Sequence, residues 1–355
     1  MVRFVDVTHL ATWIAETGPE PILTGLVEAM EADFRRWPVF DKTPRIANHS
    51  HDGVIELMPT SDDETYGFKF VNGHPINTSR GLQTVTAFGA LADVATGYPI
   101  MLSEMTLLTA LRTAATSAMA ARVLAPADST SMGMIGSGAQ AEFQALAFRT
   151  VLGVDTIRTW DTDPAALDKF VANAERLGFD VHRATGAADA IAGVDIITTC
   201  TADKRNATIV TDEMLLAATD GGRRGVHINA IGGDCPGKTE LDIEIVKRGN
   251  VFVEFAEQSF IEGEIQYLPH DHPITELWQV LTGDRVGRTS DAELTVFDSV
   301  GFAIEDFCAL RYLDAVLTAP GGERYYETID LIAEPADPKN LFSLVEAHMI
   351  SPVGN

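Results

Sequence analysis

Apolar and polar positions divide the chain into a first part with short apolar runs and a second part where strand and helix patterns alternate. Between residues 44 and 99, brief apolar segments such as GVIELMPT and YGFKFVNG are separated by turn residues, which is typical of an antiparallel sheet or barrel. Residues 105–124, dominated by Ala, Leu, Met and Thr, predict one helix. The first part therefore predicts a sheet followed by a long helix.

After residue 126 the pattern predicts strands at 131–135, 156–160, 195–199, 226–231 and 250–255, with a helix at 164–177. Such alternation indicates an α/β fold with a doubly wound parallel sheet. Residues 292–317 predict a long helix that crosses back toward the first part, and the segment YYETIDLI after Gly321 predicts another strand. We therefore expect a discontinuous domain at 1–125 and 318–355, and a second domain at 126–317.

The segment SMGMIGSGAQA at 131–141 joins an apolar strand to a helix through a G-x-G-x-x-A turn that contains Gly136 and Gly138. Such a turn lets backbone N–H groups and a helix N-terminus approach a pyrophosphate. The next predicted strand ends at Asp161, at the distance where an acid accepts hydrogen bonds from ribose hydroxyls. Together these features favour NAD over NADP. The alternative is a glycine-rich loop that only connects core elements.

Charge and cysteine content limit the partners and the compartment. The chain has 51 acidic and 26 basic residues, with a formal net charge of -25, so it should repel nucleic acids and anionic lipid headgroups. Three widely spaced cysteines suit reduced thiols rather than a disulfide framework. The sequence has no signal-peptide pattern and no run of about 18 apolar residues. We expect a cytoplasmic protein without nucleic-acid or membrane partners.

Three cations in a cation-poor chain are candidates for binding a carboxylate. Lys69 lies between two phenylalanines in a strand pattern, so it points away from the core if the rings face it, and it need not be buried. Arg112 lies within a helix of small and apolar residues, where an unpaired guanidinium is costly, so it should have an anionic partner. Arg45, taken alone, is typical of an exposed charge.

Two acids are candidates for proton transfer. Asp234 lies in INAIGGDCPGKTEL after an apolar strand, which places it at the carboxyl edge where nicotinamide and substrate meet. An Asx turn in a glycine-rich loop is the alternative role for Asp234. Glu56, alone on an apolar strand, is equally compatible with facing water. The H-x-H pairs ending at His51 and His272 have no accompanying acid or cysteine set, so we expect no metal site.

These segments resemble the ornithine cyclodeaminase and mu-crystallin family over nearly the whole chain. The motifs that carry the resemblance are Pro44 with Arg45, Glu56, the Lys69 strand, Arg112 with TAA, GSGAQ at 136–140, Asp161, TADK at 201–204, INAIGGDCPGKTEL at 228–241 and DSVGFAIED at 298–306. The segment GGDCPGKTE within INAIGGDCPGKTEL is the most specific of them. The loop at 218–225 is longer than expected for the family, which leaves the contacts of that loop open.

The resemblance implies a role for each matching position. The substrate carboxylate would be bound by Arg45, Lys69 and Arg112, with Val300 beside the substrate. Asp234 would be the catalytic carboxylate, and Glu56 would assist it. The cofactor would contact Thr84, Arg112, Gly136, Gly138, Ala139, Gln140, Asp161, Thr201, Asn229, Ala230, Ile231, Lys238 and Ser299.

The implied reaction converts L-ornithine to L-proline and ammonia with NAD+ that is regenerated in each cycle. The implied fold is a Rossmann domain plus a discontinuous α/β domain for substrate binding and dimerisation, whose sheets join across a two-fold axis into a barrel, so we expect a homodimer. Two alternatives stay open: an NAD(P)-dependent amino-acid dehydrogenase or ketimine reductase on the same fold, and a cofactor-binding protein with little catalysis. Asp234 argues against the binding protein, and Asp161 against an NADPH-dependent reductase.

Overall fold

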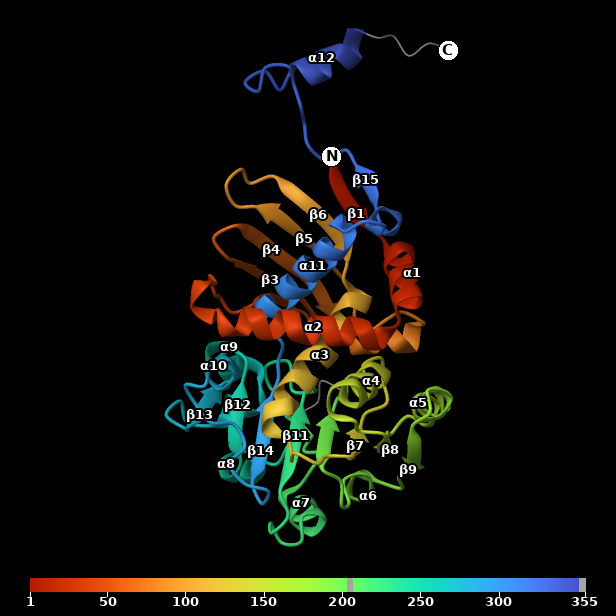
Figure 1. Ribbon diagram of the computed structural model, residues 1–355, viewed down its shortest axis with the longest axis vertical. Coiled ribbons are helices and arrows are strands. Elements are labelled where there is room, and N and C mark those ends of the chain that lie inside the picture. The colour runs from red at the N-terminus through yellow and green to blue at the C-terminus, as the bar shows by residue number, and fades with distance from the viewer. Residues whose placement is uncertain (203–206, 351–355) are drawn as a thin grey trace.

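The computed structural model describes residues 1–202 and 207–350 and contains two sheets with helices between them (Figure 1). Eight strands, all parallel, form the first sheet in the order β13-β12-β14-β11-β10-β7-β8-β9. Seven strands form the second sheet in the order β15-β1-β6-β5-β4-β3-β2, with both parallel and antiparallel pairs. We call them the parallel sheet and the mixed sheet.

The mixed sheet contains the segment predicted to be antiparallel. Strands β2 to β6 pair antiparallel in sequence order, which confirms that prediction. The strand predicted after Gly321 is β15, which pairs with β1, so segments on either side of the parallel sheet in sequence contribute to one sheet. The strands are β1 (Val2–Val5), β2 (Ile46–His49), β3 (Val54–Ser61), β4 (Thr65–Gly73), β5 (Ala87–Asp93), β6 (Pro99–Glu104) and β15 (Glu327–Ile329).

The parallel sheet confirms the predicted alternation of strands and helices. Its central strands are buried on both faces, as expected for parallel strands covered by helices. The strands are β7 (Ser131–Ile135), β8 (Thr156–Trp160), β9 (Asp180–Arg183), β10 (Ile196–Thr199), β11 (Val226–Ala230), β12 (Asn250–Val253), β13 (Ile274–Glu276) and β14 (Leu294–Asp298). The intervening helices are α4 (Ala141–Leu152), α5 (Pro164–Arg176), α6 (Ala187–Ala190), α7 (Asp212–Ala218), α8 (Ile243–Arg248), α9 (Ala256–Glu262) and α10 (Leu277–Thr282).

The prediction of one long helix at 292–317 is wrong. Its first part is the strand β14, which lies between β11 and β12, and helix α11 (Ala303–Thr318) begins only after Gly301. The segment LTVFD is rich in β-branched and aromatic residues, which favours a strand. Gly301 has a φ of +77°, a conformation that glycine adopts without strain and that separates the strand from the helix.

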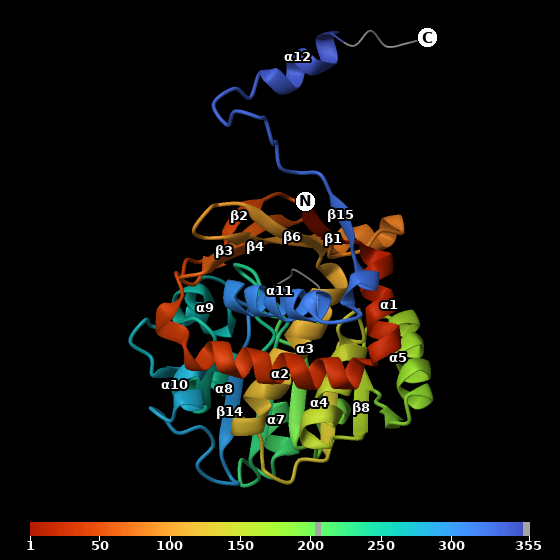
Figure 2. The ribbon, with the colours of Figure 1, turned by 45° about the horizontal axis from the view of Figure 1, so that its top comes forward.

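Helices α2 (Pro19–Arg35), α3 (Thr106–Leu124) and α11 occupy the layer between the two sheets (Figure 2). Helix α3, predicted at 105–124, contacts β5 of the mixed sheet and both β11 and β14 of the parallel sheet. Its buried alanines let α2 and α4 pack closely against it. Helix α11 lies against β3, β4 and β5. Side chains from α3 and α11 therefore reach the space between the sheets.

The remaining elements lie at the periphery. Helix α1 (Val7–Thr17) precedes α2, and short 3-10 helices are η1 (Trp37–Val39), η2 (Pro75–Arg80), η3 (Glu264–Tyr267) and η4 (Gly322–Tyr325). After β15 the chain leaves the body and ends in α12 (Ser343–Ile350), which projects away from both sheets (Figures 1 and 2). No helix in the described residues is both long and apolar enough to span a membrane.

Candidate active site

The predicted glycine turn connects β7 to α4 beside the end of β10. Gly136 has a φ of +98°, and a Cβ atom there would lie 2.8 Å from the backbone carbonyl of Cys200. Only glycine fits at this close approach of two strands. A Cβ on Gly138 would meet nothing within 4 Å, so there is open space above the turn. This geometry gives a pyrophosphate access to the N-terminus of α4.

Asp161 lies directly after β8, as predicted, and its carboxylate is held beside the glycine turn. One oxygen accepts a hydrogen bond from the backbone N–H of Ser137 at 2.6 Å, and the other accepts one from the N–H of Asp163 at 2.8 Å. Each carboxylate oxygen keeps a further lone pair. The oriented carboxylate can therefore accept hydrogen bonds from ribose hydroxyls, and its charge opposes a 2′-phosphate.

Two polar atoms near the carboxyl ends of β7 and β11 are buried and unpartnered. Within the described part of the chain, no hydrogen-bond partner contacts Gln140 Oε1 or Asn229 Oδ1. Leaving such groups unsatisfied costs about 1–3 kcal/mol each. Unsatisfied polar atoms beside an open glycine turn fit a bound dinucleotide.

The other cofactor candidates divide between two places. Most lie at the carboxyl edge of the parallel sheet: Gly136, Gly138, Ala139, Gln140, Asp161, Thr201, Asn229, Ala230, Ile231, Lys238 and Ser299. The Lys238 ammonium donates to the Thr201 carbonyl at 2.6 Å and so links two of them. Thr84 instead precedes β5 of the mixed sheet, where its carbonyl accepts from His74. Residues 203 and 204 of the TADK motif lie outside the described residues.

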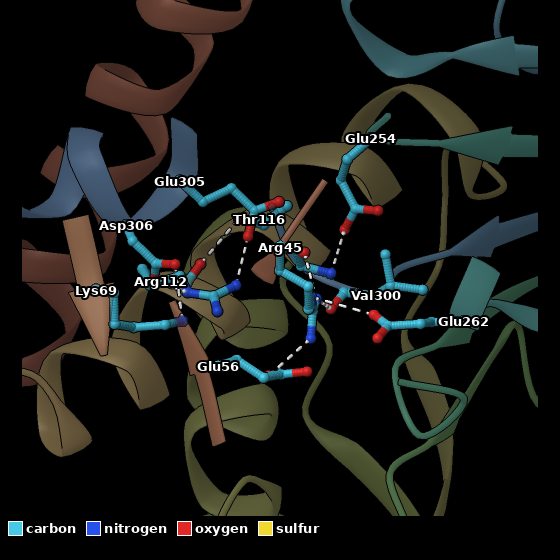
Figure 3. A network of polar contacts seen from close by, with 11 residues as sticks. Arg45, Glu56, Lys69, Arg112, Thr116, Glu254, Glu262, Val300, Glu305 and Asp306 are labelled. Carbon is cyan, nitrogen blue, oxygen red and sulfur yellow. Dashed lines mark hydrogen bonds and ion pairs between the residues drawn. The ribbon is translucent and has the colours of Figure 1, made fainter. Parts of the chain in front are cut away.

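Arg45, Lys69 and Arg112 belong to one buried network of polar contacts between the sheets (Figure 3). The Lys69 ammonium lies 2.7 Å from Asp306 Oδ2. Arg112 donates through Nε to Asp306 Oδ1 at 2.8 Å and through a terminal nitrogen to Glu305. The anionic partner expected for Arg112 is therefore confirmed, and two acids in the first turn of α11 supply it.

Lys69 points into the core, because the phenylalanine rings beside it do not face the core. Lys69 is 1% exposed and shares a face of β4 with Gly67 and Val71, both buried. The half-buried rings of Phe68 and Phe70 occupy the other face. Lysine can be buried here because the α11 carboxylates compensate for its charge.

The side chain of Arg45 is also buried, at 7% exposure, which corrects the expectation of an exposed charge. One terminal nitrogen donates to Glu56 at 3.2 Å, and the other donates to the carbonyls of Val300 and Gly301 at 2.5 and 2.7 Å. Its Nε lies 3.1 Å from Glu262 Oε2. Glu56 is 6% exposed, so it faces this network and not water. Val300, expected beside the substrate, thus lies next to a cation of the network.

Burial and charge set the protonation of the network. Burial lowers the pKa of Lys69 to about 8, and the neighbouring Arg112 adds to this effect against the attraction of Asp306. Burial raises the pKa of Glu305 to about 8 although Arg112 opposes it. For Arg45, burial alone would lower the pKa, but the Glu56, Glu262 and Asp234 carboxylates together raise it. The pKa values of Arg45 and Arg112 are raised, so both guanidinium groups stay charged, whereas the pKa values of Lys69 and Glu305 both lie near 8.

Asp234 lies at the exposed side of this network. Its side chain is 56% exposed, and its carboxylate is 3.8 Å from the Lys238 ammonium. The charge of Asp234 also contributes to the pKa shifts of Arg45 and Glu262, so it acts on the same site. The loop glycines have their own structural reason, since a Cβ on Gly232 would clash with the Glu240 carboxylate. Asp234 is therefore an exposed acid whose charge reaches the buried network.

The sequence alone missed several acids of this site. Glu254, for example, is buried and accepts hydrogen bonds from Ser299 and from the Gly301 backbone. Glu262 and Gln258 contact Arg45, yet the Arg45–Gln258 pair is separated by 213 residues in sequence. Only Glu305 and Asp306 had a sequence signal, because they fall in the DSVGFAIED motif. Among the described residues, no group of His, Cys, Asp and Glu is arranged to hold a metal ion.

Residues 8–318, which contain both the glycine turn and the cation network, match the family model described as Ornithine cyclodeaminase/mu-crystallin family. The chain belongs to this family. An ornithine cyclodeaminase of Agrobacterium fabrum is 56% identical over 345 residues, which cover 97% of this chain and 95% of that protein.

Solved structures of similar proteins show the same fold. A lysine cyclodeaminase, studied for its recognition of L-lysine, L-ornithine and L-2,4-diaminobutyric acid, is 31% identical with a TM-score of 0.84, covering 96% of this chain and 99% of that one. An archaeal alanine dehydrogenase dimer with bound NAD is 30% identical with a TM-score of 0.81, covering 93% and 99%. The α/β architecture with a Rossmann-like parallel sheet is thus shared across members that act on different amino acids.

Proposed function

We propose that this chain is an ornithine cyclodeaminase, which converts L-ornithine to L-proline and ammonia with NAD+ as a recycled cofactor. The observation that carries the proposal is the 56% identity to an ornithine cyclodeaminase over nearly the full length of both chains. The site geometry supports it. Buried cations lie on one side and the accessible Asp234 on the other, which suits a substrate with a carboxylate at one end and an ammonium at the other.

The cofactor would lie across the carboxyl edge of the parallel sheet, with its pyrophosphate at the Gly136–Gly138 turn and its adenosine ribose at Asp161. When bound, NAD+ supplies a reversible hydride acceptor for the substrate Cα atom. Asn229 and Ser299, at the ends of β11 and β14, would contact the cofactor nearer the substrate. Arg112 and Thr84 are further proposed contacts from the other side of the site.

The residues of this chain would bind the substrate and move protons. Arg45, Lys69 and Arg112 would orient the α-carboxylate, which fixes Cα in the site. Asp234 would hold the δ-ammonium and take a proton from it, so that the free amine can attack the carbon that has lost its hydride. Glu56 would assist through its contact with Arg45. Ring closure is favoured because both reacting groups belong to one molecule.

We also infer a homodimer in which the outer faces of two mixed sheets meet and form a barrel. On this face Phe88 is 48% exposed, and it stacks on Phe70 with ring centroids 5.0 Å apart. Ile55 and Tyr66 of the neighbouring strands are exposed as well. An apolar patch of this kind on a sheet is typical of a protein interface. The similarity to an alanine dehydrogenase dimer supports the same assembly.

The decisive experiment is turnover with little cofactor. Purified protein is incubated with L-ornithine and substoichiometric NAD+, and proline, ammonia and NADH are measured. We expect equal amounts of proline and ammonia, many per NAD+, without net NADH, because the hydride is returned. An amino-acid dehydrogenase, the second candidate in view of the similarity to alanine dehydrogenase, would instead accumulate NADH in step with product. A protein that only binds cofactor would form neither.

A further inference from the structure

Helix α9 follows strand β12 of the parallel sheet. One of its faces nevertheless contacts Arg45, which directly precedes β2 of the mixed sheet. The backbone N–H of Arg45 donates to Gln258 Oε1 at 2.7 Å. Gln258 Nε2 donates to Glu262 Oε2 at 2.6 Å, and the same oxygen lies 3.1 Å from Arg45 Nε. Two hydrogen bonds and one ion pair thus close a ring that joins the backbone and the side chain of one arginine to one helix. We call it the α9 ring.

We propose that Gln258 and Glu262 are positioning residues, which hold Arg45 at the site of the substrate carboxylate and so make substrate affinity depend on α9. The carboxylate at Arg45 rests on the proposed function, whereas the ring itself is a property of the chain. Neither residue has a role in the site described above other than its contact with Arg45.

The spacing of the two residues suits this role. Residues four apart on a helix lie on the same face, so Gln258 and Glu262 point to one partner together. Both are almost fully buried, at 1% and 2% exposure. The amide of Gln258 has one workable orientation, because its oxygen must face the Arg45 N–H and its NH₂ group must face the Glu262 carboxylate. The ring is therefore geometrically specific.

The ring also leaves Arg45 prepared for a ligand. A guanidinium has five N–H donors. Nε faces Glu262, one terminal nitrogen donates to the Val300 and Gly301 carbonyls, and the other donates a single hydrogen bond to Glu56. Among the described residues, the Nε–H has an ion-pair contact with Glu262 but no hydrogen-bond acceptor, so this N–H and one N–H of the nitrogen at Glu56 keep capacity for an incoming carboxylate oxygen. Arg45 therefore needs little reorganisation when substrate binds, and such preorganisation increases affinity.

A stabilising ion pair alone does not explain Glu262. Replacing a buried ion pair by apolar residues is often neutral or favourable for stability. Burial is the largest influence on Glu262 and raises its pKa to about 7. Arg45 and the hydrogen bond from Gln258 oppose this shift, whereas the Glu56 and Asp234 carboxylates add to it. A carboxylate that is costly to ionise in this place is better explained by the orientation that it gives to Arg45.

The first test measures whether α9 holds Arg45, without any substrate. Hydrogen exchange of the backbone around Arg45 is compared in the full-length protein, Glu262→Leu, Gln258→Leu and the control Glu257→Gln, which changes an exposed acid of the same helix. Both ring variants should exchange faster at Arg45, and the control should match the parent. Unchanged protection in correctly folded ring variants overturns the proposal, even if the proposed function is right.

The second test measures the consequence for the substrate. Glu262→Leu should raise KM for ornithine about tenfold or more, with kcat and NAD+ affinity within about threefold of the parent. Glu262→Gln, which keeps the shape and one acceptor, should recover part of this loss. In an Arg45→Met background, Glu262→Leu should have little further effect, because it acts through Arg45. Independent, multiplying losses would refute the positioning role, whereas a parent that makes no proline would refute only the proposed function.

Discussion

The Lys69 ammonium and the Asp306 carboxylate form a contact of 2.7 Å in which both side chains are almost completely buried. The lysine comes from β4 and the aspartate from the first turn of α11, which crosses beneath that strand. Because Asp306 also accepts from Arg112, one acid links two of the three cations proposed to bind the substrate. Helix α11 therefore sets the distance between these cations before any substrate binds.

Loss of one cation should weaken ornithine binding. Lys69→Met and Arg112→Met each remove a charge-assisted contact worth about 1.5–3 kcal/mol, so kcat/KM for ornithine should fall by about one to two powers of ten. Steady-state kinetics measure the loss, and circular dichroism with NAD+ titration checks that the fold and the cofactor site are retained. If both folded variants keep the parent kcat/KM, the carboxylate binds elsewhere.

Asp234→Asn separates catalysis from loop geometry. Asparagine keeps the size and most of the turn-forming capacity of aspartate but removes its charge and basicity. Because a positioned proton acceptor contributes about 10²–10⁴-fold, we expect proline formation to fall by at least about 100-fold while NAD+ still binds. Near-parent turnover would identify Asp234 as a loop residue and would make Glu56 the next candidate.

The carboxylate of Asp161 should select the cofactor. Its two oxygens are fixed by the Ser137 and Asp163 amides, so the charge cannot turn away from a 2′-phosphate. We expect NADP+ to support turnover at least about tenfold less well than NAD+. Asp161→Ser should raise the ratio of the NADP+ to the NAD+ activity. Equal use of both cofactors by the parent protein would contradict this assignment.

His227 should make the fold sensitive to acid. It is fully buried in β11, and its ring nitrogen Nδ1 lies 3.0 Å from Thr295 Oγ1. Burial, with a smaller effect of Arg288, lowers its pKa from 6.5 to about 3. Below pH 6.5 the unfolded chain therefore binds a proton that the folded chain does not, and stability falls as the pH decreases toward 3.

The expected contribution of His227 is about 1.4 kcal/mol of unfolding free energy per pH unit within this range. Urea unfolding of the parent and of His227→Gln at several pH values between about 4 and 6 measures it as a difference in slope. The variant should lose less stability on acidification. Parallel curves would show that His227 is protonated as readily in the folded protein as in the unfolded chain.

Local features of this chain were predictable, and contacts distant in sequence were not. The glycine turn, Asp161 after β8 and the helix α3 all follow from short patterns, and the structure has them where expected. Strand β14 was missed because its apolar spacing continues into α11, although Gly301 marks the boundary. The burial of Lys69 depends on acids in α11, which no local pattern connects to β4. The domain boundaries at residues 125 and 317 stay a prediction.

The position of β1 has a consequence for folding during synthesis. Strand β1 lies between β6 and β15, and β15 (Glu327–Ile329) follows the whole parallel sheet along the chain. The parallel sheet, in contrast, uses one continuous stretch from Ser131 to Asp298. Helix α11, which covers β3 to β5, is also synthesised after that stretch. The mixed sheet therefore begins before the parallel sheet and is completed after it. Its apolar face stays uncovered while the parallel sheet is made, which slows folding and favours aggregation.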